Sequence, residues 1–274
     1  KKLLRFPYGY KFEDDFEPTE AKFKELIQAG IMTVLYDIVE GGLTTGGNEV
    51  QTFTGGDMKV SNKLPIMLDG KMLNGVQGYI NTISVSNANA HSFLLVDVND
   101  TIFGYKGKDG QFRPFNSKFF NVEPYAKTGT DASQYSVKLQ LDRNQFDTGI
   151  SGLVSESYDF DIDDIKGYSN LEISVVEAPT VGDTTLKFKV VRKEDRVPQL
   201  GLTNTEIKIY VDGTAVVSPA LGTATSEGVY TATGLTAFTL GQKVEVKTND
   251  GTYNIVDNGV ALVKSNTAQT VVLA

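Results

Sequence analysis

Residues 228 to 247 read GVYTATGLTAFTLGQKVEVK, and this stretch is the strongest indication of fold class in the chain. Apolar and polar residues alternate on both sides of a tight turn expected at Leu240-Gly241, and such alternation is typical of strands with one buried and one wet face. We interpret the stretch as two antiparallel strands of a small β-sandwich. Modules of this build are usually binding or structural parts of a protein.

The C-terminal third repeats the same pattern. A domain boundary is expected near residues 177–180, which divides the chain into residues 1–178 and 179–274. Asp212-Gly213 is a hairpin-turn signal in this part. The strand-like segments are 185–191, 206–211, 214–218, 229–233, 244–248, 252–256 and 270–273. Their number predicts a sandwich, and residues 230–246 resemble the late strands of bacterial immunoglobulin-like and fibronectin type III-like domains. Because the chain has no cysteine and no tryptophan, the likeness is one of architecture only.

Residues 1–178 are expected to form a β-rich domain with one short helix. Thr19 is a suitable N-cap, and Gly30 can supply the left-handed stop at the other end of the helix. A meander is expected over 91–115, because Asp109-Gly110 is a strong hairpin signal. The expected strands are 31–39, 49–54, 75–85, 92–98, 101–105, 111–115, 133–141 and 171–176. The predicted fold class is therefore mainly β, with this domain followed by an Ig-like sandwich.

Composition excludes several function classes. The net charge is -8, and all of the excess lies in residues 1–178, which carry 17 basic and 25 acidic groups, against nine of each from Pro179 onward. An acidic body argues against nucleic acid as a partner, and no apolar run reaches the length of a membrane helix. Without cysteine the chain has no disulfide, thiolate nucleophile or sulfur-bound zinc. The single histidine, His91, is expected to be structural or merely solvated, so no catalytic residue is assigned.

Acidic residues are the best candidates for chemistry. Asp159, Asp161 and Asp163 stand at two-residue spacing in YDFDIDD, which on a strand would place three carboxylates on one face that could attract calcium. The spacing of an EF-hand loop is absent, and a solvated acidic edge is the favoured interpretation. A second acidic cluster, residues 13–17, precedes the helix and suits its positive N-terminal end. We assign no metal-binding or cofactor-binding residue.

Glycine pairs at 41–42, 46–47 and 55–56 lack the Lys-Ser/Thr of a phosphate loop. They are expected to form flexible turns or an extended loop. Long loops in compact domains are often interaction arms, so the segment 41–56 is a candidate for contact with a partner.

The segment FLLVDVNDTIFGYKGKDGQFRPF and the later TGTDASQYSVKLQLDRNQFD resemble structural proteins of tailed bacteriophages that infect Bacteroidetes, including crAss-like phages. The resemblance covers roughly residues 31–146. It implies a non-enzymatic structural protein that is located in the virion and binds no cofactor. It further implies that other virion proteins are the partners, through self-association or contact with the major capsid protein.

Three functions stay open at this point. The first is an auxiliary capsid or head-decoration protein that assembles through residues 1–178 and displays the Ig-like domain, which could contact host-surface glycans. The second is a tail-tube subunit, a closely related structural role. The third is a surface-associated carbohydrate-binding or hydrolytic protein with an Ig-like spacer, against which the absence of tryptophan weighs.

Overall fold

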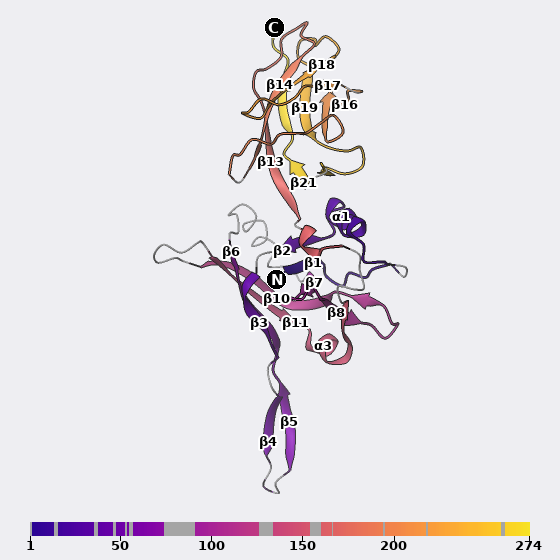
Figure 1. The fold of residues 1–274 in the computed structure, drawn as a ribbon, viewed down its shortest axis with the longest axis vertical. Helices are drawn as coiled ribbons and strands as arrows, with labels where there is room; N and C mark the ends of the chain where they lie inside the picture. Colours follow the sequence, from indigo (N-terminus) through magenta and orange to yellow (C-terminus); the bar gives the residue numbers. More distant parts are fainter. Residues whose placement is uncertain are drawn as a thin grey trace. The chain divides into compact units, whose positions relative to one another are not determined.

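The computed structural model confirms a mainly β protein. It describes residues 2–13, 16–35, 38–45, 48–52, 54, 57–73, 91–125, 134–153, 160–165, 167–193, 195–217, 219–258 and 261–274. The chain divides into two compact units (Figure 1). Unit 1 comprises Lys1–Phe23 and Ile31–Lys166, and unit 2 comprises Lys24–Gly30 and Gly167–Ala274. No helix in the described ranges is long and apolar enough to cross a membrane.

The elements up to residue 166 are mostly strands. They are β1 (Lys2–Pro7), α1 (Glu20–Gln28), β2 (Thr33–Leu35), β3 (Ile38–Thr45), β4 (Asn48–Thr52), β5 (Met58–Lys63), β6 (Ile66–Leu73), β7 (His91–Val96), β8 (Ile102–Lys106), β9 (Phe112–Arg113), β10 (Phe115–Tyr125), β11 (Gln134–Leu141), α3 (Arg143–Gly149), β12 (Ile150–Leu153) and the 3-10 helix η2 (Ile162–Asp164). The expected strand 75–85 lies outside the described residues.

Strand β10 joins two parts of the sheet in unit 1. Its first residues pair with β7, and from Ser117 onward it pairs with β11, with a register shift between Ser117 and Phe119. The order along the sheet is β12-β8-β7-β10-β11-β6-β3, and β1 pairs with both β2 and β7. Bulges let a strand bend from one layer to another. Side chains from both parts accordingly share one core, in which Leu3, Phe93 and Val137 are almost fully buried.

Several expectations for the residues up to 166 are confirmed. The Thr19 hydroxyl accepts a hydrogen bond from Lys22 N–H at 3.3 Å, and Gly30 has φ +71° at the end of α1. Strand β11 alternates between buried and more exposed residues as predicted. Gly110, with φ +82°, turns the β8–β9 hairpin. The expectation of a single helix is wrong, because α3 follows β11 with Asp142 as its N-cap.

The expectation that Gly41-Gly42 forms a flexible turn or part of an extended loop is wrong. Both glycines lie inside β3, opposite Gly70 and Asp69 of β6. Strand β3 passes so close to β6 that a Cβ atom on Gly41 would lie 2.3 Å from the Asp69 carbonyl oxygen. Glycine is present here because the backbones approach closely, which sequence alone does not distinguish from a breaker.

Unit 2 from Gly167 onward is a β-sandwich. Its strands are β13 (Tyr168–Val175), β14 (Leu186–Arg192), β15 (Ile207–Val211), β16 (Thr214–Ala215), β17 (Ala220–Leu221), β18 (Val229–Thr233), β19 (Lys243–Thr248), β20 (Ile255–Asp257), β21 (Leu262–Ser265) and β22 (Ala268–Val271). One sheet has the order β17-β18-β14-β13-β21-β20 and the other β16-β15-β19-β22. A single hydrophobic core contains Phe188 and Tyr230 from the first sheet and Val244 and Val246 from the second.

The stretch 228–247 supplies one strand to each sheet. Strand β18 pairs with β14 and β17, whereas β19 pairs with β15 and β22. The expected turn at Leu240-Gly241 is present, with φ +82° at Gly241, but it does not join the two strands as a hairpin within one sheet. Leu235 and Phe238 of the connection are buried in the core, and this burial draws the chain from one sheet to the other.

The division between the units falls at Lys166/Gly167, earlier than the boundary predicted near 177–180. Residues 171–175 of the segment 171–176, which the sequence placed in the first domain, belong to β13. That strand pairs with β14 and β21 of the sandwich. Its first half aligns in parallel with β21, a strand that the sequence did not reveal.

Candidate functional site

The acidic run that includes Asp161 and Asp163 forms a 3-10 turn and not a strand. Asp161 is the N-cap of η2, and its carboxylate accepts a hydrogen bond from Asp163 N–H at 2.8 Å. The hypothesis of three carboxylates on one strand face is therefore not supported by the backbone here. Asp159 lies outside the described residues.

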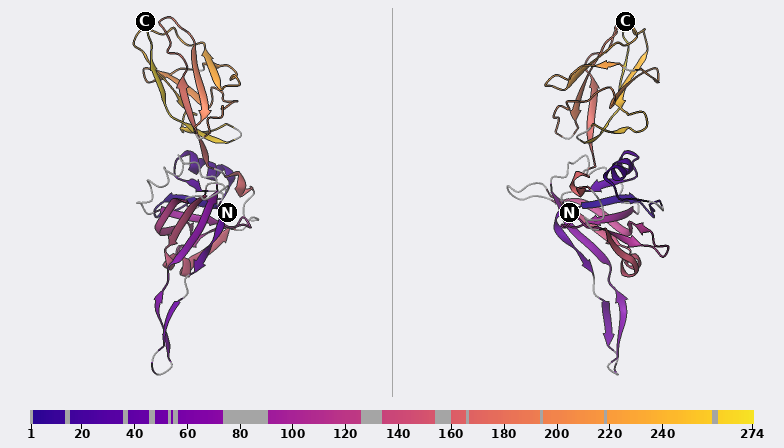
Figure 2. Two further views of the ribbon diagram at one scale, coloured as in Figure 1. Left: turned by 90° about the vertical axis from the view of Figure 1, so that its left-hand side faces the viewer. Right: turned by 45° about the vertical axis from the view of Figure 1, so that its right-hand side comes forward.

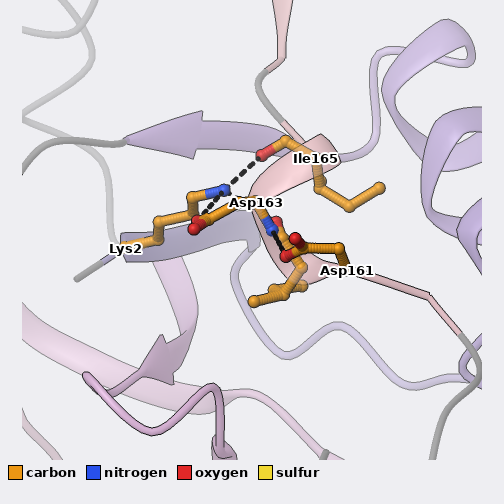
Figure 3. Close-up of polar contacts among 5 residues, drawn as sticks. Lys2, Asp161, Asp163 and Ile165 are labelled. Carbon is orange, nitrogen blue, oxygen red and sulfur yellow. Dashed lines mark hydrogen bonds and ion pairs between the residues drawn. The ribbon is translucent and has the colours of Figure 1, made fainter.

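A buried lysine occupies the position opposite this turn. The Lys2 ammonium donates to the Ile162 carbonyl at 2.7 Å and to the Ile165 carbonyl at 3.2 Å, and it lies 3.1 Å from Asp163 Oδ1 (Figure 3). Its side chain is only 6 % exposed, whereas that of Asp163 is 47 % exposed. The contacts join β1 to a turn about 160 residues later, as the separation of Lys2 from Ile162 shows. Sequence reasoning missed Lys2, because a lysine near the start of a strand carries no local sign of burial.

Replacing Lys2 with methionine is expected to lower the free energy of unfolding of unit 1 by about 2–3 kcal/mol. The variant keeps an apolar stem but leaves two carbonyls without their charged donor, and buried acceptors without partners are costly. Chemical denaturation followed by circular dichroism measures the change. Asp163→Asn is the matched control, and it should cost less than about 1 kcal/mol because this carboxylate is half exposed. Equal losses in both variants would contradict a role for the carbonyl contacts.

The other acidic cluster is arranged around the start of α1. Glu13 lies 3.8 Å from Lys22 Nζ, and the Glu17 carbonyl accepts from Thr19 N–H at 2.9 Å. Asp14 and Asp15 are outside the described residues. Among the residues that the structure does describe, no group of three or more His, Cys, Asp or Glu side chains is placed to hold a metal ion.

His91 is the first residue of β7 and is half-buried. Its ring makes edge contacts with Phe93 and Phe120, at centroid distances of 6.4 and 6.5 Å. The Ser117 hydroxyl donates to the His91 carbonyl at 2.8 Å. The imidazole therefore lies beside two aromatic rings, and the backbone of His91 is hydrogen-bonded to β10.

Within the segment 41–56, residues 41–45 belong to β3 and residues 48–52 form β4, whereas the glycine pairs 46–47 and 55–56 lie outside the described residues. Beyond β3, the strands β4 and β5 pair with each other, and within the described residues neither pairs with any other strand. This ribbon, which we call the arm (residues 48–52 and 58–63), extends past the ends of β3 and β6 in each view (Figures 1 and 2). Glu49, Met58 and Lys59 are exposed on it, Met58 by 75 %.

An open pocket lies elsewhere in unit 1, between the segment before α1 and the β8–β9 turn. Phe12, Phe16 and Phe112 line it together with polar side chains, and its volume is about 500 Å³. Sequence reasoning did not identify it, because its two walls are about 90 residues apart in the chain.

No protein-family model matches the chain, and no curated protein matches it either. The fold alone defines its class, a mainly β protein whose second unit is a β-sandwich.

Proposed function

We propose that the chain is a non-enzymatic structural subunit of a tailed-phage virion, an auxiliary capsid or head-decoration protein. In this proposal unit 1 assembles with neighbouring virion proteins and unit 2 is displayed. The resemblance of residues 31–146 to phage structural proteins supports the virion assignment. The arm is the structural observation that supports assembly.

The arm supports assembly because of its unshared strand edges. An isolated two-stranded hairpin is marginally stable in water. The described residues of β4 and β5 pair only within the ribbon, and an open strand edge is a template for pairing with another chain. We infer that a neighbouring subunit in the virion adds a strand to this ribbon and thereby stabilises it.

The same arm favours a second candidate, a tail-tube subunit. If the receiving edge belongs to another copy of this chain, the contact is head-to-tail, and such contacts close into rings or continue as filaments. The sheet of unit 1 offers β3 as a terminal strand in its order. The two candidates therefore share one assembly element and differ in its partner.

Strand order supports an Ig-like assignment for unit 2. Taking β13, β14, β15, β17, β18, β19 and β22 as strands A, B, C, D, E, F and G, the sheets have the orders D-E-B-A and C-F-G. An immunoglobulin sandwich has the same two sheets. In this scheme β20 and β21 are an insertion between F and G, and β16 is an extra edge strand beside C.

A variant in which Asn48–Lys63 is replaced by an Asn-Gly turn tests the proposal. We expect the full chain to form ordered oligomers or to coat particles, and the armless variant to stay monomeric with its unfolding transition retained. Sedimentation and electron microscopy measure both. Lys59→Ala is the matched control, because it removes an exposed charge but keeps the backbone groups that pair.

The form of the assembly separates the candidates. Binding to a capsid lattice supports the decoration protein, and rings or tubes of the chain alone support the tail-tube subunit. A full chain that remains a monomer and binds no virion particle would overturn both. Retention on polysaccharides in that case would favour the carbohydrate-binding alternative.

A further inference from the structure

We propose that the pocket of unit 1 that Phe12, Glu13 and Phe16 line together with residues of the β8–β9 hairpin binds a neutral saccharide. Its volume of about 500 Å³ lies within the range of small-molecule sites, which combine apolar walls with a few fixed polar groups. The pocket has both features. None of its lining residues belongs to the arm, so the proposal does not depend on how the chain assembles.

Aromatic rings supply the apolar wall. Phe12 is 5 % exposed and stacks on Phe16 with ring centroids 3.9 Å apart. Phe112, from the other side of the pocket, is nearly parallel to Phe12, with an interplanar angle of 10° and centroids 6.4 Å apart. Phe16 and Phe112 are half-buried and line the pocket. The C–H groups on the face of a pyranose ring pack well against such rigid aromatic surfaces.

Arg113 holds the polar groups of the β8–β9 turn in place. Its side chain is only 11 % exposed, and its guanidinium donates to the Asp109 carboxylate and, at 3.0 Å, to Gln111 Oε1. Asp109 Oδ1 also accepts from Gln111 N–H at 3.2 Å. Desolvation acts to raise the pKa of Asp109, but the hydrogen bond from Gln111 and the charge of Arg113 outweigh it and lower the pKa. The carboxylate is therefore ionised and oriented before any ligand binds.

This arrangement suits hydroxyl groups better than a charged ligand. An ionised carboxylate has about four acceptor positions, so Asp109 retains capacity to accept from sugar hydroxyls. Glu13 and Asp109 are acidic and Lys106 is basic, so the pocket presents no uniform charge of one sign that would select a charged ligand. A neutral saccharide has apolar faces for the rings and hydroxyl edges for Asp109 and Gln111. Because these groups are already fixed, little ordering is required on binding.

Calorimetric titration of the full chain with maltotriose, cellotriose, mannotriose and galactotriose tests the proposal, with a heparin-derived tetrasaccharide as the anionic probe. We expect saturable binding of at least one neutral probe. Phe112→Ala is expected to weaken it about tenfold or more through loss of stacking. Gln111→Ala, at a position that is part of a turn, is a second variant in case Phe112→Ala unfolds. Phe119→Ala is the matched control, because Phe119 is 46 % exposed on β10 and does not line the pocket.

Loss of binding in Phe112→Ala and Gln111→Ala, with Phe119→Ala unchanged, supports the site. Absence of saturable binding by every neutral probe overturns the proposal, as does binding of the anionic probe alone. Equal weakening by Phe119→Ala also overturns it, because the ligand would then bind elsewhere. Sedimentation of the same variants reports assembly separately, so failure of the saccharide site and failure of the virion role give different results.

Discussion

Phe188→Ala is expected to lower the free energy of unfolding of unit 2 by about 3–5 kcal/mol, the usual cost of removing a buried phenylalanine. Phe188 lies on β14, between β13 and β18, and has 0 % exposure. Its ring stacks on Tyr230 with centroids 5.8 Å apart. Truncation therefore leaves a cavity in the centre of the sandwich. The walls of this cavity belong to two packed sheets, so they can collapse into it only partly.

Two further variants separate the cavity from other effects. Tyr230→Phe keeps the ring but removes a hydroxyl that donates to the Gln199 carbonyl at 2.9 Å and accepts from Leu202 N–H at 3.1 Å, so it should cost about 1–2 kcal/mol. Val181→Ala, at a residue 52 % exposed, should stay within about 0.5 kcal/mol. Urea denaturation with hydrogen exchange on β14 measures all three. A loss for Phe188→Ala no larger than that for Val181→Ala would contradict the shared core.

Gly41→Ala is expected to destabilise unit 1 by about 3 kcal/mol, combining backbone strain with overpacking. Gly41 has φ +139°, and its Cβ would lie 2.3 Å from the Asp69 carbonyl oxygen and 2.4 Å from Gly70 Cα. These are backbone atoms of the paired strand, so relief requires β3 and β6 to separate.

The neighbouring glycine is the control for this prediction. A Cβ on Gly42 would meet no atom within 4 Å, so Gly42→Ala should change the free energy of unfolding by less than about 1 kcal/mol. Amide hydrogen exchange in β3 and β6, measured by mass spectrometry, reports how far each of the two substitutions destabilises the pairing of these strands. Similar exchange in both would show that the close approach of β3 to β6 does not limit residue size.

Features that depend on neighbouring residues were predicted well. The Thr19 cap and Gly30 stop of α1, the Asp109-Gly110 turn and the alternation in β11 are all set by atoms a few residues apart. Asp212-Gly213 likewise turns β15 into β16, with positive φ at both residues. The physical reason is that backbone dihedral preference and side-chain period act over one turn or one strand.

Features that depend on contacts between distant segments were not predicted from the sequence. The sequence does not reveal that Lys2 lies beside η2, or that β13 pairs in parallel with β21. Nor does it place the walls of the aromatic pocket together. Each of these depends on which buried surfaces meet after folding, and many pairings of short apolar strands satisfy the same local pattern.

The stretch 228–247 shows the same division within 20 residues. Its alternation determined by itself that residues 229–233 and the run ending at Thr248 are strands with one buried face. Only the tertiary structure decided that they belong to opposite sheets, because burial of Leu235 and Phe238 carries the connection across the core. Strand character is a property of local side-chain period, whereas the choice of partner depends on how the whole apolar surface of the sandwich is buried.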